Sequence, residues 1–455
     1  MKHLFIDDEM VEESTACELT VNQPEKLGPI TEVNKVNIYN RSAYGTVLDN
    51  GHIARMWGGS GSGPGGVRPK PGLQYSTSLD GLTWYSPDLE GYKAGKKRKS
   101  NVVVEANAEG SIFIDPNDRA FPYKYVFHEN DVGLQMIKSP DGIDWIKPSL
   151  LLDSGHRDTQ NTFFFDRRIE KYVGYMRGWT QPRSVQDREK TRLRCIERVE
   201  FEDFSQLIPS KKQGGRALGE SAIVMKPDDE DMPDVDLYNN AVIQYRDDVY
   251  LAFPSLYRHL QIGKGYDYRE LPNEGIMEAQ LAVSRDGIKW NRFRRPYFQP
   301  GAYGEGDNCV VYMMCGTVQR EGYVYQYYAG SDYTHRLNNI FSVRGIHYYL
   351  VYALRQRIDG FVSYSNYDTV PGHLQTKSVP WHGYLFANYD AGASGYIKAR
   401  VLGLDDKVLA TQKVPLVGNW PAKQIEFDND LLKYINKPVK ISFEFRNCKI
   451  FGFEV

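Results

Sequence analysis

The sequence lacks the features that mark membrane-spanning and nucleic-acid-binding proteins. None of its apolar runs approaches the roughly 18 residues that cross a bilayer as a helix. It has no excess of one charge either, because 56 Lys and Arg stand against 58 Asp and Glu. The single basic run, at residues 96–99, is too short to follow a nucleic-acid backbone and is expected to be a solvated loop. We therefore expect neither a membrane nor a nucleic acid among its partners.

Cysteine is also scarce. The five cysteines are scattered, odd in number and without a Cys-x-x-Cys pair, which argues against a disulfide framework and a zinc ribbon. The N-terminus turns acidic after residue 6 and lacks the apolar core of a secretory signal. The location stays open: cytoplasmic as the sequence is written, or periplasmic or secreted if a leader was removed.

Helical patterns are sparse, and a repeated turn motif is the clearest positive signal. Ser-x-Asp-Gly-x-x-Trp occurs at residues 78–84, 139–145 and 284–290. An Asp-Gly pair between apolar runs predicts a tight hairpin turn, so the motif is interpreted as a turn device. The copies are 61 and 145 residues apart, and 145 is about twice a slightly longer unit, with a degenerate copy at residues 199–204 in the gap. A strand unit repeated in this way predicts a β-propeller with long blades.

The rest of the chain fits an all-β protein of two domains. Apolar and aromatic-rich runs around the turns count to five blades of three or four strands. This predicts a five-bladed β-propeller over residues 1–352. From residue 360 short alternating strands follow, which predict a C-terminal β-sandwich over residues 353–455. The best helix candidate is the short segment at residues 427–437.

Several segments carry a family resemblance, at residues 4–12, 44–59, 112–118, 158–178, 236–255, 280–290, 360–366 and 437–455. They resemble the furanosidase superfamily of glycoside hydrolases. That superfamily includes invertases and fructanases of family 32, arabinanases and β-xylosidases of family 43, and a little-characterised bacterial group related to them. The resemblance implies a catalytic five-bladed propeller followed by a sandwich. The Trp-Met-Asn-Asp-Pro-Asn motif of invertases is absent, and residues 156–159 match an Arg-Asp-Pro motif only in part.

Carboxylates at the starts of the inner strands are the candidate catalytic residues. The innermost strand of each blade lines the central channel, and four of the five begin near an acidic residue. Glycoside hydrolysis needs two carboxyl groups beside the scissile bond. The candidates, in order, are Asp158 and Asp236, then Glu305 or Asp307, then Glu109, with their roles left open. Each could instead cap a turn or lie on a solvated surface.

Polar and aromatic side chains near these strands are the candidate sugar-binding residues. They are Arg157, Asn161, Arg177, Arg55, Trp57, Tyr238, His156 and His335. The Gly-rich loop at residues 58–66 lacks the Lys-Ser/Thr ending of a phosphate-binding loop and is interpreted as a rim of the pocket. The acidic loop at residues 227–236 could hold a structural calcium, although its spacing differs from an EF-hand. No cofactor and no catalytic metal are expected.

The leading hypothesis is a glycoside hydrolase that cleaves a plant, algal or microbial glycan with a carboxylate pair at the channel mouth. One alternative is a non-catalytic, lectin-like propeller, and another is a protein-interaction scaffold with a flat apolar face. The sandwich is expected to brace the propeller or to mediate homo-oligomer formation. The sugar, the linkage, and the choices between exo and endo and between retaining and inverting action stay open.

Overall fold

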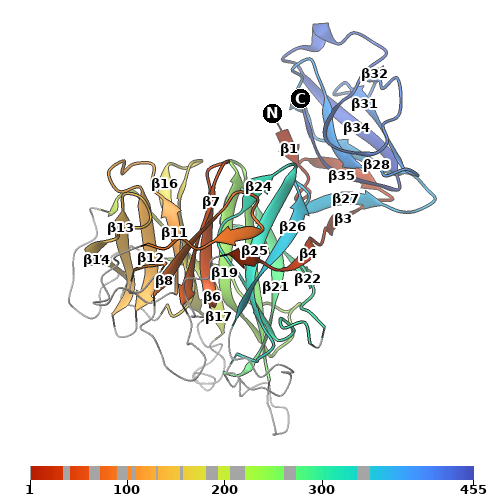
Figure 1. The fold of residues 1–455 in the computed structure, drawn as a ribbon. Coiled ribbons are helices and arrows are strands. Elements are labelled where there is room, and N and C mark those ends of the chain that lie inside the picture. The colour runs from red at the N-terminus through yellow and green to blue at the C-terminus, as the bar shows by residue number, and fades with distance from the viewer. Residues whose placement is uncertain are drawn as a thin grey trace. The chain divides into compact units, whose positions relative to one another are not determined.

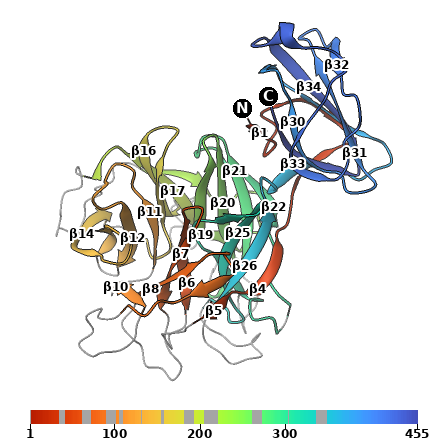
Figure 2. The same cartoon turned by 45° about the horizontal axis from the view of Figure 1, so that its top comes forward.

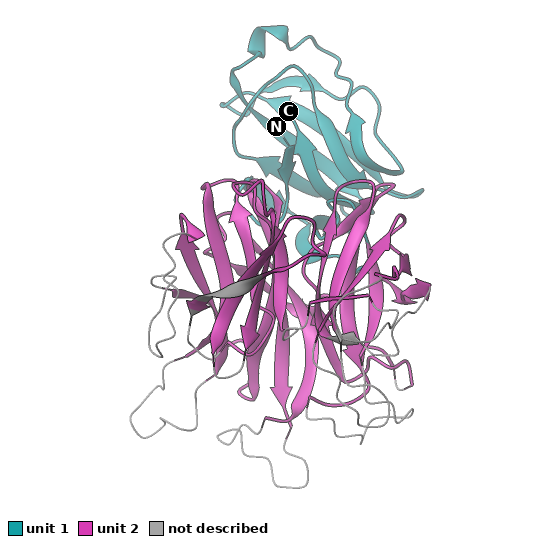
Figure 3. Cartoon of the chain, turned by 60° about the vertical axis from the view of Figure 1, so that its left-hand side comes forward, with its two compact units in different colours: residues 1–24, 356–455 teal, residues 25–355 magenta. Residues whose placement is uncertain are grey.

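The computed structural model describes residues 2–33, 41–60, 72–89, 101–104, 109–129, 132–153, 157–180, 193–204, 221–260, 273–302, 304–335 and 349–455. These residues form strands and short turns, with one named 3₁₀ turn at Leu432–Tyr434 inside the segment expected to be helical. No helix among them is long and apolar enough to cross a membrane. The chain divides into two units, residues 25–355 and residues 1–24 with 356–455 (Figure 3).

The larger unit consists of five sheets that follow one another along the chain, and their strands pair antiparallel except for one short pair at the margin of the first sheet (Figure 1). The first contains β6 (Arg41–Asp49), β7 (Ala54–Ser60), β8 (Leu73–Ser78) and β9 (Thr83–Tyr85), with β5 (Thr31–Val33) and β10 (Val102–Val104) at its margins. The second contains β11 (Gly110–Ile114), β12 (Tyr123–Glu129), β13 (Gly133–Ser139) and β14 (Ile146–Asp153). The third contains β15 (Thr162–Asp166), β16 (Lys171–Trp179), β17 (Arg194–Phe201) and β18 (Ala222–Met225).

The fourth and fifth sheets complete this unit. The fourth contains β19 (Val235–Arg246), β20 (Val249–His259), β21 (Gly275–Ser284) and β22 (Asn291–Pro296). The fifth contains β23 (Val310–Met313), β25 (Tyr323–Ser331), β26 (Leu350–Arg357) and β4 (Glu25–Pro29), with the short β24 (Val318–Arg320) paired to β25. Because β4 precedes all the other strands of the unit, it pairs the beginning of the unit with its end (Figure 2).

The innermost strands close a ring, which makes the unit a five-bladed β-propeller. Each of β6, β11, β15 and β19 contacts the inner strand of the next blade, and β23 contacts β6 again. A parallel bridge between Thr46 and Cys315 joins the first blade to the fifth. The prediction of an all-β propeller is therefore confirmed by the strand pairing itself.

The smaller unit is a sandwich of two sheets. One contains β3 (Glu18–Val21), β27 (Val362–Asn366), β35 (Cys448–Glu454), β30 (Phe386–Asp390), β33 (Asn419–Gln424) and β1 (Lys2–Leu4). The other contains β2 (Val11–Thr15), β28 (Gly372–Thr376), β34 (Pro438–Arg446), β31 (Tyr396–Leu402), β32 (Val408–Thr411) and β29 (Val379–Pro380). Its core contains the buried residues Phe5, Trp381 and Phe443.

The position of the N-terminal segment differs from the prediction, which placed residues 1–352 in the propeller. Strands β1, β2 and β3 pair with β35, β28 and β27 of the sandwich. Phe5 is fully buried in the sandwich core, so the segment contributes to that core. Such short strands carry no local signal for their sheet, because the pairing partners lie more than 340 residues away, as the contact between Thr20 and Ser365 shows.

The repeated motif forms the same turn in each of its three copies, between the third and fourth strands of a blade. In the copy at residues 284–290, the Asp286 carboxylate accepts hydrogen bonds from the backbone N–H groups of Ile288 and Lys289, both at 2.8 Å. Gly287 has φ +72°, and Trp290 donates its indole N–H to the Gly287 carbonyl at 3.1 Å. The glycine is required there because other residues rarely adopt a positive φ.

Each of these turns is also bound by the neighbouring blade, which the sequence did not predict. The glycine carbonyl accepts a second hydrogen bond from an aromatic side chain on the second strand of the adjacent blade. The three bonds are Tyr327 Oη to Gly81 O at 2.6 Å, Trp57 Nε1 to Gly142 O at 2.8 Å and Tyr175 Oη to Gly287 O at 2.7 Å. The motif is therefore both a turn and a clasp between blades.

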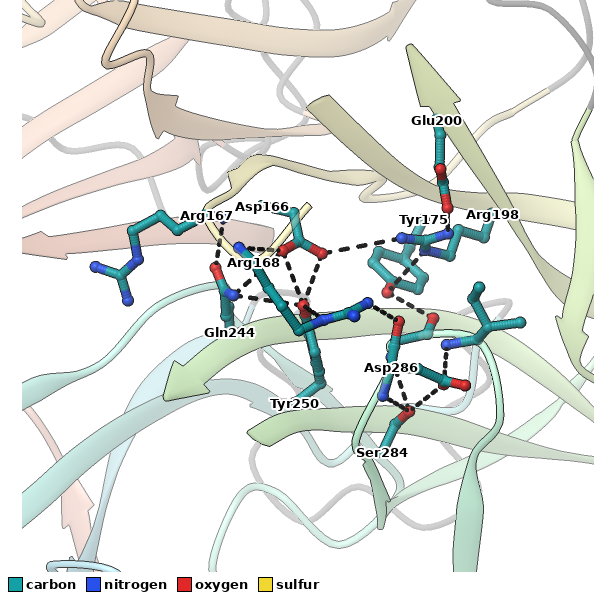
Figure 4. Close-up of polar contacts among 12 residues, drawn as sticks. Asp166, Arg167, Arg168, Tyr175, Arg198, Glu200, Gln244, Tyr250, Ser284 and Asp286 are labelled. Atoms are coloured by element: carbon teal, nitrogen blue, oxygen red, sulfur yellow. Dashed lines mark hydrogen bonds and ion pairs between the residues drawn. The ribbon is translucent and has the colours of Figure 1, made fainter. Parts of the chain in front are cut away.

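A buried polar network strengthens the clasp between the third and fourth blades (Figure 4). Tyr250 donates its hydroxyl to both oxygens of the buried Asp166 carboxylate, at 2.8 and 2.7 Å. Arg168 bonds the Tyr250 hydroxyl and the Asp286 carbonyl, and Arg198 bonds the Tyr175 hydroxyl. These residues lie where the inner strands end, at the end of the propeller that carries the repeated turns. We call it the turn end, and the opposite end the mouth.

The clasp predicts an unequal cost for two glycine substitutions. A Cβ on Gly287 would lie 2.6 Å from the Tyr175 hydroxyl, whereas a Cβ on Gly51 would meet nothing within 4 Å. Both glycines have positive φ, so Gly51→Ala measures the backbone strain alone, about 1–2 kcal/mol. Gly287→Ala should lower the free energy of unfolding by a further 1–3 kcal/mol or so, because the aromatic ring must move. Urea denaturation measures both, and equal losses would contradict the clasp.

Candidate functional site

A layer of polar side chains crosses the propeller axis and fixes how far the inner strands of different blades are shifted along the axis relative to one another. Gln160 accepts a hydrogen bond from Gly45 N–H at 3.1 Å and donates one to the Met313 carbonyl at 3.2 Å. Thr162 donates its hydroxyl to the Asn240 carbonyl at 2.9 Å. Residues that precede this layer in the inner strands therefore lie on its mouth side.

Tyrosines form the wall above this layer on the side of the first, fourth and fifth blades. Tyr44, Tyr238 and Tyr312 are buried and meet edge to face, with ring centroids 5.5 and 5.8 Å apart. His335 adds to the wall, with Nδ1 3.1 Å from the Tyr312 hydroxyl and Nε2 3.4 Å from that of Tyr238. Burial, together with electrostatic interactions with the neighbouring Tyr238 and Glu109, raises the pKa of Tyr44 well above its ordinary value. Its hydroxyl therefore stays neutral.

Arg177, on β16, is a fully buried cation at the mouth. Its guanidinium donates to Asp158 Oδ1 at 2.6 Å and to the Tyr238 carbonyl at 2.7 Å, and it lies over the Tyr238 ring at 4.2 Å. Burial alone would lower the pKa of Arg177, but Tyr238 and Asp158 outweigh it and the pKa is raised. Asp158 thus faces a permanent positive charge, while 34% of its own side chain stays exposed.

Asp236 is held in a second, more buried ion pair. Arg194 Nη1 lies 3.0 Å and His259 Nε2 3.3 Å from Asp236 Oδ2. Burial raises the pKa of Asp236, but the hydrogen bond from His259 and the charge of Arg194 reverse the direction, and the pKa is lowered. Only 2% of the side chain is exposed, so Asp236 is out of reach of a ligand in this conformation.

A third pair joins Arg157 to Glu197 on β17, with 3.0 Å between Nη1 and Oε2. Neither side chain is more than 12% exposed. Glu197 and Arg194 were not predicted as site residues. The prediction considered only residues at the starts of inner strands, whereas Glu197 and Arg194 both lie on β17, the third strand of the blade.

Glu109 differs from Asp158, Asp236 and Glu197 in that no arginine among the described residues pairs with it. It directly precedes β11, and 34% of its side chain is exposed. Its Oε2 atom is buried, accepts no hydrogen bond from the described residues, and lies 3.8 Å from His128 Nδ1. Burial raises the pKa of Tyr125 far above its ordinary value, and the charge of Glu109 raises it further.

Glu109 and Asp158 lie at the same end of neighbouring blades. The Ser111 hydroxyl of β11 donates to the Asn161 carbonyl at 2.6 Å, which aligns the two inner strands. Glu109 precedes Ser111 by two residues and Asp158 precedes Asn161 by three. Both carboxylates also lie near Tyr44. The charge of Glu109 contributes to the raised pKa of Tyr44. Thr159, the residue after Asp158, has its hydroxyl 3.4 Å from the Tyr44 hydroxyl.

Glu305 and Asp307 are not brought to this mouth cluster. Asp307 is buried against blade five, where Lys26 Nζ lies 2.8 Å and the Tyr328 hydroxyl 2.7 Å from Oδ2. The reason is the length of the inner strand. Asp158 and Asp236 lie four residues before the layer residues Thr162 and Asn240. Asp307 lies eight residues before Cys315, whose Sγ is 3.3 Å from the Thr162 hydroxyl.

The predicted sugar-binding residues divide into three groups. Arg55 and Trp57 belong to the turn end, where Trp57 is fully buried against Gly142, so neither lies in the mouth cluster. Arg157, Asn161, Arg177, Tyr238 and His335 do lie at the mouth. Asn161 is buried there and bonds the backbone at Arg157, Thr159 and Arg177, so it shapes the loop. His156 lies outside the described residues.

The acidic loop is occupied by arginines. Arg294 lies 2.7 Å from Asp228 and 3.1 Å from Asp231, and Arg292 pairs with both carboxylates. This leaves the loop little negative charge for a calcium ion. No group of three or more His, Cys, Asp or Glu suited to a metal occurs in the part of the chain that the structure describes.

Comparisons with known proteins give structural likeness only. No family model and no curated protein matches the sequence. The structure is similar to a family 43 arabinoxylan arabinofuranohydrolase from Bacillus subtilis, with 11% identity, 92% of this chain and 96% of that chain covered, and a TM-score of 0.41. A fructofuranosidase from Schwanniomyces occidentalis matches with 10% identity, 100% and 98% coverage and a TM-score of 0.41. An N-acetylgalactosamine deacetylase from F. plautii matches with 12% identity, 75% and 96% coverage and a TM-score of 0.45.

The buried Asp236 pair predicts a pH-dependent contribution to stability. Asp236→Asn should lower the free energy of unfolding near pH 7 by about 3 kcal/mol, because Arg194 loses its counter-charge. The folded-state pKa of Asp236 is below its ordinary 3.8. The stabilisation is therefore present above the unfolded-state pKa and lost as the pH falls through the folded-state value. The difference between wild type and variant in urea denaturation should shrink below about pH 4.

The matched control is Asp247→Asn, because the Asp247 side chain is 81% exposed and pairs only loosely with Arg167. It should change stability by less than about 0.5 kcal/mol at any pH. Two results would contradict a charged Asp236 in the folded protein. One is an Asp236→Asn variant as stable as the wild type at neutral pH, and the other is a loss of stability that stays the same in strong acid.

Proposed function

We propose that the protein is a glycoside hydrolase and that Glu109 and Asp158 are its carboxylate pair. The observation that supports this is the exposure of both side chains on neighbouring blades at the mouth, 34% in each case. Cleavage of a glycosidic bond uses one carboxyl group that gives a proton to the leaving oxygen and a second that acts at the anomeric carbon. Asp236, although first ranked with Asp158 from the sequence, is too buried to serve without rearrangement.

The two carboxyl groups have different surroundings, as such a pair requires. Asp158 Oδ1 lies 2.6 Å from the permanently charged guanidinium of Arg177, so a fixed positive charge faces the group that acts at the anomeric carbon. Glu109 lies near tyrosines and a histidine, with no arginine in contact among the described residues. Bond cleavage consumes one water overall. The Asp158 carboxylate either bonds to the anomeric carbon first or takes a proton from the attacking water.

The rest of the mouth suits a sugar. Sugars offer hydroxyl groups together with apolar C–H faces, and tyrosine and histidine side chains offer both kinds of contact. Tyr238 and His335 present such a surface, and the Arg177–Asp158 pair supplies charged donors and acceptors. We propose a glycan of plant, algal or microbial origin as the substrate, without assigning the sugar or the linkage.

The test is a screen of aryl glycosides and glycans for released sugar, followed by two variants. Wild type should cleave at least one linkage. Asp158→Asn and Glu109→Gln should lower kcat/KM on that substrate by about 100-fold or more, because each removes a group that acts in the reaction. Circular dichroism should show that both variants fold. Asp158→Asn should nevertheless be less stable than the wild type in urea, because the buried Arg177 loses its counter-charge.

Two acidic residues at the turn end supply matched controls. Asp247→Asn and Glu202→Gln make the same chemical changes on side chains that are 81% and 73% exposed. Both should retain wild-type kcat/KM. If no glycan is cleaved but one raises the melting temperature, the protein is a binding module. If Asp307→Asn abolishes turnover while Asp158→Asn does not, the pair lies in blade five.

A further inference from the structure

We propose that Glu109 is the proton donor of the pair and that His128 is the residue that positions it. The inference rests on the proposed function, since it assigns roles within the same site. It starts from the pairing of charges at the mouth. Asp158, Asp236 and Glu197 each have an arginine partner within 3.0 Å, namely Arg177, Arg194 and Arg157. Glu109 has none among the described residues.

This difference separates the roles. A proton donor must hold its proton until the leaving oxygen takes it, and an arginine in contact would favour loss of that proton. Asp158 is therefore unsuited to be the donor, because its Oδ1 lies 2.6 Å from a buried guanidinium. Glu109 is suited, because its Oε2 atom is buried without a hydrogen bond from the described residues while the side chain is 34% exposed.

His128 is fixed relative to Glu109 by strand pairing. The backbone N–H of His128 donates to the Glu109 carbonyl at 3.1 Å, and the next pair in the ladder is Gly110 with Phe127. The imidazole is 2% exposed, with Nδ1 3.8 Å from Glu109 Oε2. That separation is longer than a hydrogen bond, so the carboxyl group is oriented without being locked.

Gly110 permits this close arrangement. A Cβ at Gly110 would lie 2.1 Å from the Val126 carbonyl oxygen and 2.7 Å from the Phe127 Cα. Any side chain there would push β11 away from β12 and would separate Glu109 from His128. The pairing of Glu109 with His128 therefore depends on the glycine between Glu109 and Ser111.

The chemical step is a single proton transfer coupled to bond cleavage. The bond between the anomeric carbon and the glycosidic oxygen breaks, and its electron pair stays on that oxygen. The Glu109 proton moves to the same oxygen, which leaves as an alcohol, and Glu109 becomes a carboxylate that faces His128. Water supplies the hydroxyl group of the released sugar and the proton that restores the site.

The test compares two leaving groups on the sugar that the screen identifies. A dinitrophenyl glycoside needs little protonation to leave, whereas a phenyl or alkyl glycoside needs a full proton donor. Glu109→Gln should lose about 100-fold or more in kcat/KM on the poor leaving group and less than about tenfold on the dinitrophenyl glycoside. Asp158→Asn should lose similar factors on both, because its role does not depend on the leaving group.

His128→Asn tests the positioning role with the same ratio. It should lose at least about tenfold more activity on the poor leaving group than on the dinitrophenyl glycoside. The ratio of the two kcat/KM values does not depend on how much of the variant is folded, so a purely structural loss would leave the ratio at its wild-type value. His52→Asn, in the exposed turn between β6 and β7, is the matched control and should leave both rates unchanged.

The outcomes separate this inference from the proposed function. A wild type that cleaves neither glycoside overturns both. An active wild type whose Glu109→Gln variant loses equal factors on the two glycosides overturns Glu109 as the donor. A selective loss in Glu109→Gln with an unchanged ratio in His128→Asn retains the donor and overturns the positioning role.

Discussion

The mouth of the propeller depends on one buried guanidinium. Arg177 donates to Asp158 in the loop before β15 and to the Tyr238 carbonyl on β19, and it covers the ring of Tyr238. A buried cation of this kind is tolerated only when its charge and its donors are matched. The loop of blade three and the inner strand of blade four must therefore keep their relative position, and the exposed face of Asp158 is defined by the same contacts.

The two ends of the propeller differ in how far their polar groups are buried and paired. At the turn end, aromatic groups bind the glycine carbonyls of the repeated turns, and the Asp166 carboxylate at the centre of the polar network is fully buried. At the mouth, paired charges are only partly enclosed, and Glu109 stays without an arginine among the described residues. Buried polar groups whose hydrogen bonds are all made within the protein rigidify a fold. Polar groups that keep unused hydrogen-bonding capacity can bind a ligand.

The sequence predicts local features well and partnerships between distant segments poorly. The turn around Gly287 follows from Ser-x-Asp-Gly-x-x-Trp alone, but its bond to Tyr175 does not, because that partner lies on another blade. The rule for inner strands located Glu109, Asp158 and Asp236 at the mouth, although their catalytic roles stay predictions. It failed for Asp307, because the inner strand of blade five begins only at Val310. The sandwich position of residues 1–24 depends on pairing with strands at the other end of the chain.

The most direct measurement is a crystal structure of the Asp158→Asn variant with the glycan that the wild type cleaves. We expect the scissile oxygen to lie within hydrogen-bond distance of the Glu109 carboxyl group, with the residue 158 side chain beside the anomeric carbon. A sugar bound to blade five near Asp307, or at the turn end near Trp57, would contradict the assignment of the mouth as the active site.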